Sequence, residues 1–212
     1  MKLNRIKAVI FDMDGVLIDA KDWHYDAINK SLAIFGLEIS RYDHLNTFDG
    51  LSTGQKLKML SKMHVLPVTL HSFINEMKQQ YTMDITHQLC KPAFHHQYAL
   101  SKLKEQGYEL AVASNSIRNT VKVMMEKSSL IEYLSFYLSN QDVINSKPDP
   151  EIYNLAISRF GFRPEECVIV EDNENGLKAA RASGAHVLKV ETVNDVNFDN
   201  ITAFIKEVET ND

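Results

Sequence analysis

Five short apolar runs, each followed by a stretch of helical character, constrain the fold of this chain more than any other feature. The first run, Ala8–Phe11, stops at Asp12, and a run this short without a helical period is typical of a buried strand. Four similar strands are expected at residues 108–113, 136–139, 167–170 and 186–190. The alternation of strands and helices predicts an α/β fold, a Rossmann-like, doubly wound parallel sheet with helices on both faces.

Helices are expected between these runs. Asp149-Pro150-Glu151 offers a side-chain cap, a proline for the first turn and an early acid, so a helix should run from there to Phe160 and stop at Gly161. Further helices are expected at about residues 96–106, 117–127 and 174–183 and from about residue 200.

The stretch from residue 18 to residue 90 has no strand pattern. Apolar side chains recur at helical spacing from Trp23 to Phe35, Ser52 or Thr53 can cap a second helix that reaches about Met63, and a third helix should fill residues 69–87. We therefore expect a sheet domain made of residues 1–17 and 91–212, interrupted by a helical domain at residues 18–90.

The length, charge and apolar runs of the chain limit which classes of binding partner and which cellular location are expected. The chain has 212 residues, enough for a core without a structural metal, and a formal net charge of −5, which disfavours nucleic acid or an anionic membrane as the main partner. The apolar run before Asp12 is too short for a signal-peptide core, and no run is long enough to span a membrane. Cys90 and Cys167 are expected to be buried thiols. We expect a cytoplasmic protein, either a monomer or a weak homodimer.

Polar residues follow the predicted strands at the edge where open α/β sheets bind ligands. Asp12 and Asp14 directly follow the first strand, and a glycine follows them. A pair of aspartates at this spacing occurs by chance about once in a chain of this composition, but four preceding apolar residues and a following glycine make chance agreement rare, on the order of 0.001. The alternative is a surface turn with two solvated acids.

Three further groups occupy comparable positions, and each has an ordinary structural explanation when taken alone. Ser114 and Asn115 could be helix caps, Lys147 could be a solvated lysine, and Glu171 and Asp172 could lie in a turn. Together the four strand ends supply carboxylates, a hydroxyl with helix amides, and a cation. Hard oxygen ligands suit Mg²⁺, and a metal with a lysine stabilises a transferring phosphoryl group.

The chain resembles the haloacid dehalogenase-like phosphohydrolase superfamily, in the branch that contains β-phosphoglucomutase and small sugar-phosphate phosphatases. The segments that carry the resemblance are AVIFDMDGVLID (8–19), AVASNS (111–116), SKPDPEIY (146–153) and VIVEDNENGLKAARASGAHVLKV (168–190). By this resemblance, residues 18–90 correspond to the family's helical cap.

The resemblance implies a role for each core residue. Asp12 is the nucleophile that forms an aspartyl-phosphate, and Asp14 is the general acid and base. Ser114 and the amide of Asn115 bind phosphoryl oxygens, and Lys147 neutralises charge on the nucleophile and the phosphate.

The same resemblance implies that Mg²⁺ is bound by Asp12, the backbone carbonyl of Asp14 and Asp172, with Glu171 as a direct or an indirect partner. An aspartate at position 14 favours hydrolysis of a phosphate ester, because the dehalogenase and phosphonate-cleaving branches lack it.

Candidate substrate-binding residues in the helical segment match the family less closely than the core residues do. His24 corresponds to a histidine of the mutase, although a lone helical histidine is more often a packing or surface residue. Gly50, Ser52 and Thr53 correspond to the family's substrate loop, but the mutase has an arginine where this chain has Thr53.

The mutase also has a lysine where this chain has Ile117, and Arg118 or Lys56 is the alternative source of that charge. The sequence favours a Mg²⁺-dependent phosphatase acting on a small phosphorylated metabolite, such as a sugar phosphate. A β-phosphoglucomutase-type mutase is the alternative of the same class. A phosphoacceptor signalling module or a non-catalytic binding protein is the alternative of another class, but in receiver domains the adjacent acids precede the phosphorylated aspartate.

Overall fold

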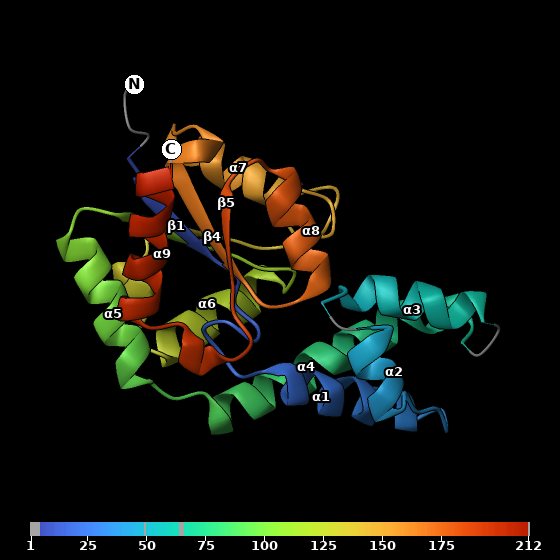
Figure 1. Ribbon diagram of the computed structural model, residues 1–212. Coiled ribbons are helices and arrows are strands. Elements are labelled where there is room, and N and C mark those ends of the chain that lie inside the picture. The colour runs from blue at the N-terminus through green and yellow to red at the C-terminus, as the bar shows by residue number, and fades with distance from the viewer. Residues whose placement is uncertain (1–4, 49, 64–65, 212) are drawn as a thin grey trace. The chain divides into compact units, whose positions relative to one another are not determined.

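The computed structural model describes residues 5–48, 50–63 and 66–211. Contacts divide the chain into two compact units (Figure 1). One consists of Met1–Asp19 with Lys91–Asp212, and the other of Ala20–Cys90.

The first unit is built on a sheet of five parallel strands in the order β3-β2-β1-β4-β5. The strands are β1 (Ala8–Phe11), β2 (Glu109–Ala113), β3 (Phe136–Leu138), β4 (Cys167–Glu171) and β5 (His186–Lys189). In the central strand, Phe11 is in register with Val112 of β2 and Val170 of β4. The carboxyl ends of these three strands therefore lie side by side, and the predicted parallel α/β sheet is confirmed.

Helices cover both faces of this sheet: α7 and α8 pack on one face, and α5 and α9 on the other (Figure 1). The helices of this unit are α5 (Phe94–Glu105), α6 (Arg118–Lys127), α7 (Glu151–Phe160), α8 (Glu174–Ala182) and α9 (Phe198–Asn211), with 3₁₀ turns η2 (Ile131–Tyr133), η3 (Pro164–Glu166) and η4 (Val193–Asp195). α7 ends as predicted at Gly161, whose φ of 72° is the left-handed conformation that glycine adopts readily.

The core under α7 and α8 is assembled from alternate strand residues and from one face of each helix. Ala8 and Ile10 of β1 contribute to it, together with Ile152, Tyr153 and Ala156 of α7. This spacing of buried residues along α7 is that of an amphipathic helix on a sheet. The core therefore fixes the start of α7, next to the carboxyl ends of the strands.

In its described residues, the second unit contains helices joined by turns and loops, and no strand. It contains α1 (Lys21–Ala33), α2 (Arg41–Asn46), α3 (Thr53–Lys62), η1 (Val68–Leu70) and α4 (His71–Leu89). Its core joins Ile28 and Leu32 of α1 to Leu57 of α3 and Ile74 of α4. The sequence prediction missed α2, because six residues are too few to show a helical period and only the Ser40 cap marks its start.

One predicted helix start is corrected. Pro150 was expected inside the first turn of α7, but the helix begins at Glu151 and Pro150 precedes it. Asp149 nevertheless caps the chain locally, because its carboxylate accepts the Glu151 N–H at 3.0 Å. Cys90 and Cys167 are both buried and form no disulfide, as expected. Within the described ranges, the helices are too short or too polar to span a bilayer.

Candidate active site

Asp12 follows β1 directly and is held by the neighbouring strand, because its N–H donates to the Val170 carbonyl at 3.0 Å. Its side chain is 7% exposed, and the ammonium of Lys147 donates to its Oδ1 at 2.6 Å. Lys147 precedes α7 and its side chain is 2% exposed. Two residues from separate strand-end segments thus form a buried ion pair at the carboxyl edge of the sheet.

The Lys147 ammonium has three N–H donors, and three acceptors surround it. Besides Asp12, it donates to the hydroxyl oxygen of Tyr153 at 2.7 Å and to Oε2 of Glu171 at 2.9 Å. Its position is therefore set by α7 and by the end of β4.

Both carboxylate oxygens of Glu171 accept hydrogen bonds from protein donors. Its Oε2 accepts from Lys147 and from the Tyr153 hydroxyl, the latter at 2.6 Å. Its Oε1 accepts from the Asp172 N–H and from Asn173 Nδ2, both at 3.1 Å. A Cβ on Gly176 of α8 would overlap this carboxylate, so the glycine is required by the close approach of the helix.

Burial and the neighbouring charges together shift the pKa values of Lys147 and Tyr153. Burial alone would lower the pKa of Lys147, but the adjacent carboxylates of Asp12 and Glu171 raise it above its usual value. Burial also raises the pKa of Tyr153 well above its usual value, and the charge of Glu171 adds to this. At neutral pH the site thus holds an ammonium and a phenol that keeps its proton to donate.

The acidic side chains around Lys147 carry more negative charge than its single ammonium can balance. Burial, followed by the negative charge of Glu171, raises the pKa of Asp12 well above its usual value despite the attraction of Lys147. For Glu171, burial raises the pKa, but Lys147 and the Tyr153 hydrogen bond outweigh it and lower the pKa below its usual value. Because one ammonium faces several carboxylates, a further cation bound there would be stabilised by the excess negative charge.

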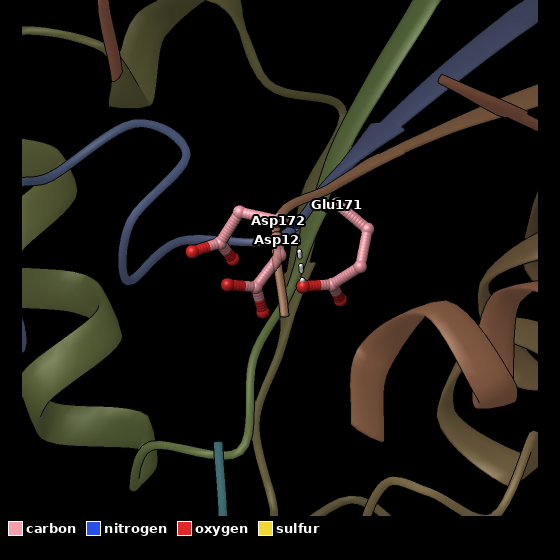
Figure 2. Close-up of side chains that lie close together, drawn as sticks. All are labelled: Asp12, Glu171 and Asp172. Atoms are coloured by element: carbon pink, nitrogen blue, oxygen red, sulfur yellow. Dashed lines mark hydrogen bonds between the residues drawn. The ribbon is translucent and has the colours of Figure 1, made fainter. Parts of the chain in front are cut away.

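A candidate metal position lies among these acids. Carboxylate oxygens of Asp12, Glu171 and Asp172 lie within 4.8 Å of one another, and Figure 2 shows the three groups converging at the ends of β1 and β4. An all-oxygen, anionic donor set fits Mg²⁺ better than it fits softer metals. Because the oxygens of Glu171 already accept from protein donors, Asp12 and Asp172 are the better placed ligands.

Asp14 lies in the turn after β1 and is tied to the end of β2. Gly15 has a φ of 94°, and its N–H donates to the Ile18 carbonyl at 2.7 Å, which closes the turn. The Ser116 hydroxyl donates to Asp14 Oδ2 at 2.9 Å. Ser114 is buried, and its Oγ accepts the Ser116 N–H at 3.0 Å. Asp14 and Ser114 therefore belong to one connected polar network.

Asn115 supports Lys147 through its side chain. Its Oδ1 accepts the Lys147 N–H at 3.1 Å, and its Nδ2 donates to the Lys147 carbonyl at 3.3 Å. This pair of bonds joins the end of β2 to the segment before α7. All the core residues singled out from the sequence thus meet at this edge of the sheet.

The residues predicted in the helical unit have local partners of their own. His24 of α1 faces Lys78 of α4, with Nζ and Nδ1 3.1 Å apart. Gly50 has a φ of 67°, and Thr53 is the first residue of α3. Ser52 caps α3, and its hydroxyl and backbone N–H both donate to the Gln55 side chain at 2.9 Å. A helix cap therefore already explains the serine.

Tyr153 and Ser116 were missed as site residues. Tyr153 shares its helix face with Ile152, Ala156 and Ile157, so its spacing indicates a core residue, and it does lie in the core as well. Ser116 directly follows Ser114-Asn115, which was a usable signal.

Comparison with known proteins agrees with this geometry. A family profile described as haloacid dehalogenase-like hydrolase matches residues 9–190, so the chain belongs to that family. A phosphorylated carbohydrates phosphatase from Thermotoga maritima is 27% identical over 179 residues, which cover 84% of this chain and 82% of the relative. A pyrophosphatase from Bacillus velezensis is 28% identical over 190 residues, covering 85% and 81%.

The fold is also found among solved structures. A β-phosphoglucomutase from Clostridium difficile superposes with a TM-score of 0.82 at 22% identity, covering 95% of this chain and 98% of that one. At this identity the likeness concerns the fold. Family and relatives together support a haloacid dehalogenase-like phosphatase.

Proposed function

We propose that this chain is a Mg²⁺-dependent phosphatase that hydrolyses a small phosphorylated metabolite, a sugar phosphate, through an aspartyl-phosphate. The observation that carries the proposal is the buried Asp12 carboxylate, with Oδ1 2.6 Å from the Lys147 ammonium and with Asp172 beside it. A carboxylate held in place by a fixed cation is suited to nucleophilic attack on phosphorus.

In the first step, an oxygen of Asp12 attacks the phosphorus and the bond from phosphorus to the leaving oxygen breaks. Asp14 gives its proton to that oxygen, so the product leaves as an alcohol. In the second step, Asp14 takes a proton from water as the water attacks the phosphorus. The bond to Asp12 then breaks, releasing phosphate and restoring both carboxylic groups to their starting states.

The phosphoryl group is held by residues on the ends of β2 and before α7. Ser114 and the N–H of Asn115 donate to its oxygens, and Lys147 balances the charge that it brings next to Asp12. The Ser116 hydroxyl, which donates to Asp14 Oδ2 at 2.9 Å, fixes the proton-transfer group.

Mg²⁺ would be held by Asp12, the backbone carbonyl of Asp14 and Asp172, with Glu171 acting through its hydrogen bonds to Lys147 and Asp172 N–H. When bound, it supplies positive charge that stabilises the transferring phosphoryl group.

The substrate class follows from the relatives. The Thermotoga maritima relative is named for phosphorylated carbohydrates, which supports a sugar phosphate here. We propose residues 18–90 as the cap that selects it, with His24, Gly50, Ser52 and Thr53 as contacts. The same proposal includes a monomer or weak homodimer in the cytoplasm that needs no macromolecular partner.

The residues at positions 117 and 118 disfavour a hexose-phosphate mutase. Residue 117 is Ile, and the neighbouring Arg118 guanidinium is paired with Asp142 at 2.5 Å. A mutase has to hold the second phosphate of a bisphosphate, whereas a phosphatase does not. Arg118 is already engaged by a carboxylate, so it is poorly placed to replace the missing lysine.

Two assays test the proposal. Phosphate release from 4-nitrophenyl phosphate should require Mg²⁺ and stop on adding EDTA, and a panel of sugar phosphates should then rank the substrates. With β-glucose 1-phosphate and a trace of the 1,6-bisphosphate, we expect free phosphate. Accumulation of glucose 6-phosphate without free phosphate would establish the mutase instead.

A further inference from the structure

The hydroxyl of Tyr153 is a buried polar group to which the proposed mechanism assigns no role. The side chain is fully buried and packs among apolar residues of α7 and the sheet, where a phenylalanine would fill nearly the same space. Burying a hydroxyl is unfavourable unless it is hydrogen-bonded. This one accepts from Lys147 Nζ at 2.7 Å and donates to Glu171 Oε2 at 2.6 Å.

These two bonds close a ring, because Lys147 also donates to the same Glu171 oxygen at 2.9 Å. The ring uses two of the three ammonium N–H groups and leaves the third for Asp12 Oδ1. An ammonium on a four-carbon stem rotates freely unless its donors are assigned in this way. The direction of the bond to Asp12 is thus set by acceptors on α7 and β4.

We propose that Tyr153 is a positioning residue of this phosphatase, whose hydroxyl orients the Lys147 ammonium on the nucleophile Asp12. The inference rests on the proposed function, since it assigns Asp12 the attack on phosphorus. Tyr153 acts through Lys147 and contacts no reacting atom.

The Glu171 side chain in this ring is held by α8 and by the residues that follow β4. A Cβ at position 176 would overlap the Glu171 carboxylate, so α8 leaves this side chain no alternative place on that side. Asp172 N–H and Asn173 Nδ2 hold its other oxygen. Gly176→Ala therefore disturbs the ring without altering Tyr153 or Lys147, which makes it an independent second variant.

The kinetic test compares Tyr153→Phe with wild type on 4-nitrophenyl phosphate and Mg²⁺. We expect kcat to fall about 10-fold or more while KM stays within about twofold of the wild-type value. A poorly oriented nucleophile raises the free energy of the transition state but does not weaken substrate binding. Gly176→Ala should lower kcat in the same way. Tyr137→Phe, which removes a hydroxyl from half-buried β3, is the matched control and should retain wild-type kcat.

Crystal structures of wild type and Tyr153→Phe show the contact between Lys147 Nζ and Asp12 Oδ1 independently of any activity measurement. We expect the contact between Nζ and Oδ1 to lengthen beyond hydrogen-bonding distance, or to split into two conformers, in the variant. A wild-type kcat in Tyr153→Phe, or an unchanged single contact in its crystal structure, would overturn the inference. If wild type itself releases no phosphate, the proposed function fails, and the crystal structures still decide the positioning role.

Discussion

Lys147 and Asp12, 135 residues apart in the sequence, form a buried ion pair with Nζ 2.6 Å from Oδ1. Removing one partner of such a pair leaves the other charge without compensation in a low-dielectric setting. In the proposed mechanism, the pair also places the attacking carboxylate next to a fixed positive charge. We therefore expect both stability and turnover to depend on this contact.

Lys147→Met tests that dependence. Without the ammonium, nothing on Lys147's side balances the negative charges of Asp12 and of the incoming phosphate. We therefore expect the rate of 4-nitrophenyl phosphate hydrolysis to fall by about 10²–10³-fold. The free energy of unfolding in EDTA, measured by urea titration, should fall by about 3 kcal/mol. Lys122→Met, which removes an exposed lysine of α6, is the control and should change neither quantity. Wild-type activity in Lys147→Met would contradict the role.

Ser116→Ala tests the support of Asp14. Loss of the hydroxyl that donates to Asp14 Oδ2 leaves the proton-transfer group less well oriented. Esters with poor leaving groups need that proton most, so we expect a loss of about 10-fold for sugar phosphates and a smaller one for 4-nitrophenyl phosphate. Steady-state kinetics on both substrates measure the difference. An equal loss on both substrates would argue against a role in proton transfer.

Metal binding should be visible as stability. If Mg²⁺ binds among the acids at the ends of β1 and β4, a concentration 100 times its Kd should add about 2.7 kcal/mol to the free energy of unfolding. Asp172→Asn should abolish that gain, and it should stabilise the metal-free protein because it removes one of several crowded negative charges.

The control for the metal experiment is Asp84→Asn, which removes an exposed carboxylate of α4 and should respond to Mg²⁺ as wild type does. Thermal or urea unfolding with Mg²⁺ and with EDTA measures both effects. A Mg²⁺ response that survives in Asp172→Asn would place the ion elsewhere.

A pH effect on stability is expected from His96 of α5. Burial lowers its pKa to about 4, although its hydrogen bond to the Val193 carbonyl at 2.8 Å opposes this. The unfolded chain takes up a proton at about pH 6.5, before the folded one does, so this contribution is fully present above pH 6.5. It is lost as the pH falls towards 4, by up to about 3 kcal/mol.

Urea unfolding of wild type and His96→Gln between pH 4 and pH 7.5 measures this loss as a difference between the two curves. His87→Gln, which changes an exposed histidine of α4, is the control and should follow wild type. If the His96→Gln curve keeps the full wild-type slope across this range, His96 is not the group responsible.

Much of the sheet was predictable because each strand is a short apolar run that ends at a polar residue. Runs such as Ala8–Phe11 and Cys167–Glu171 are buried throughout, which is the pattern of parallel strands covered on both faces. Helix ends marked by Gly161 were predictable for the same local reason. The six-residue α2 was not, since its formation depends on packing in its own unit rather than on a helical period.

The site was predictable in its residue types but not in its connections. Strand ends brought Asp12 and Asp172 to one edge, whereas the three-way contact of Lys147 with Tyr153 and Glu171 depends on where α7 starts relative to β4. Tyr153 has the spacing of a core residue and serves as one, so nothing in the pattern marks its hydroxyl. Only side-chain packing reveals that polar role.

The most direct test of the account is the turnover of Asp12→Asn. Phosphate release from 4-nitrophenyl phosphate with Mg²⁺ is measured for wild type, for this variant and for the control Asp84→Asn, after unfolding curves confirm that each is folded. If Asp12 attacks phosphorus, Asp12→Asn should lose at least about 10³-fold of the wild-type rate, while the control keeps it. A wild-type rate in Asp12→Asn would contradict the aspartyl-phosphate mechanism.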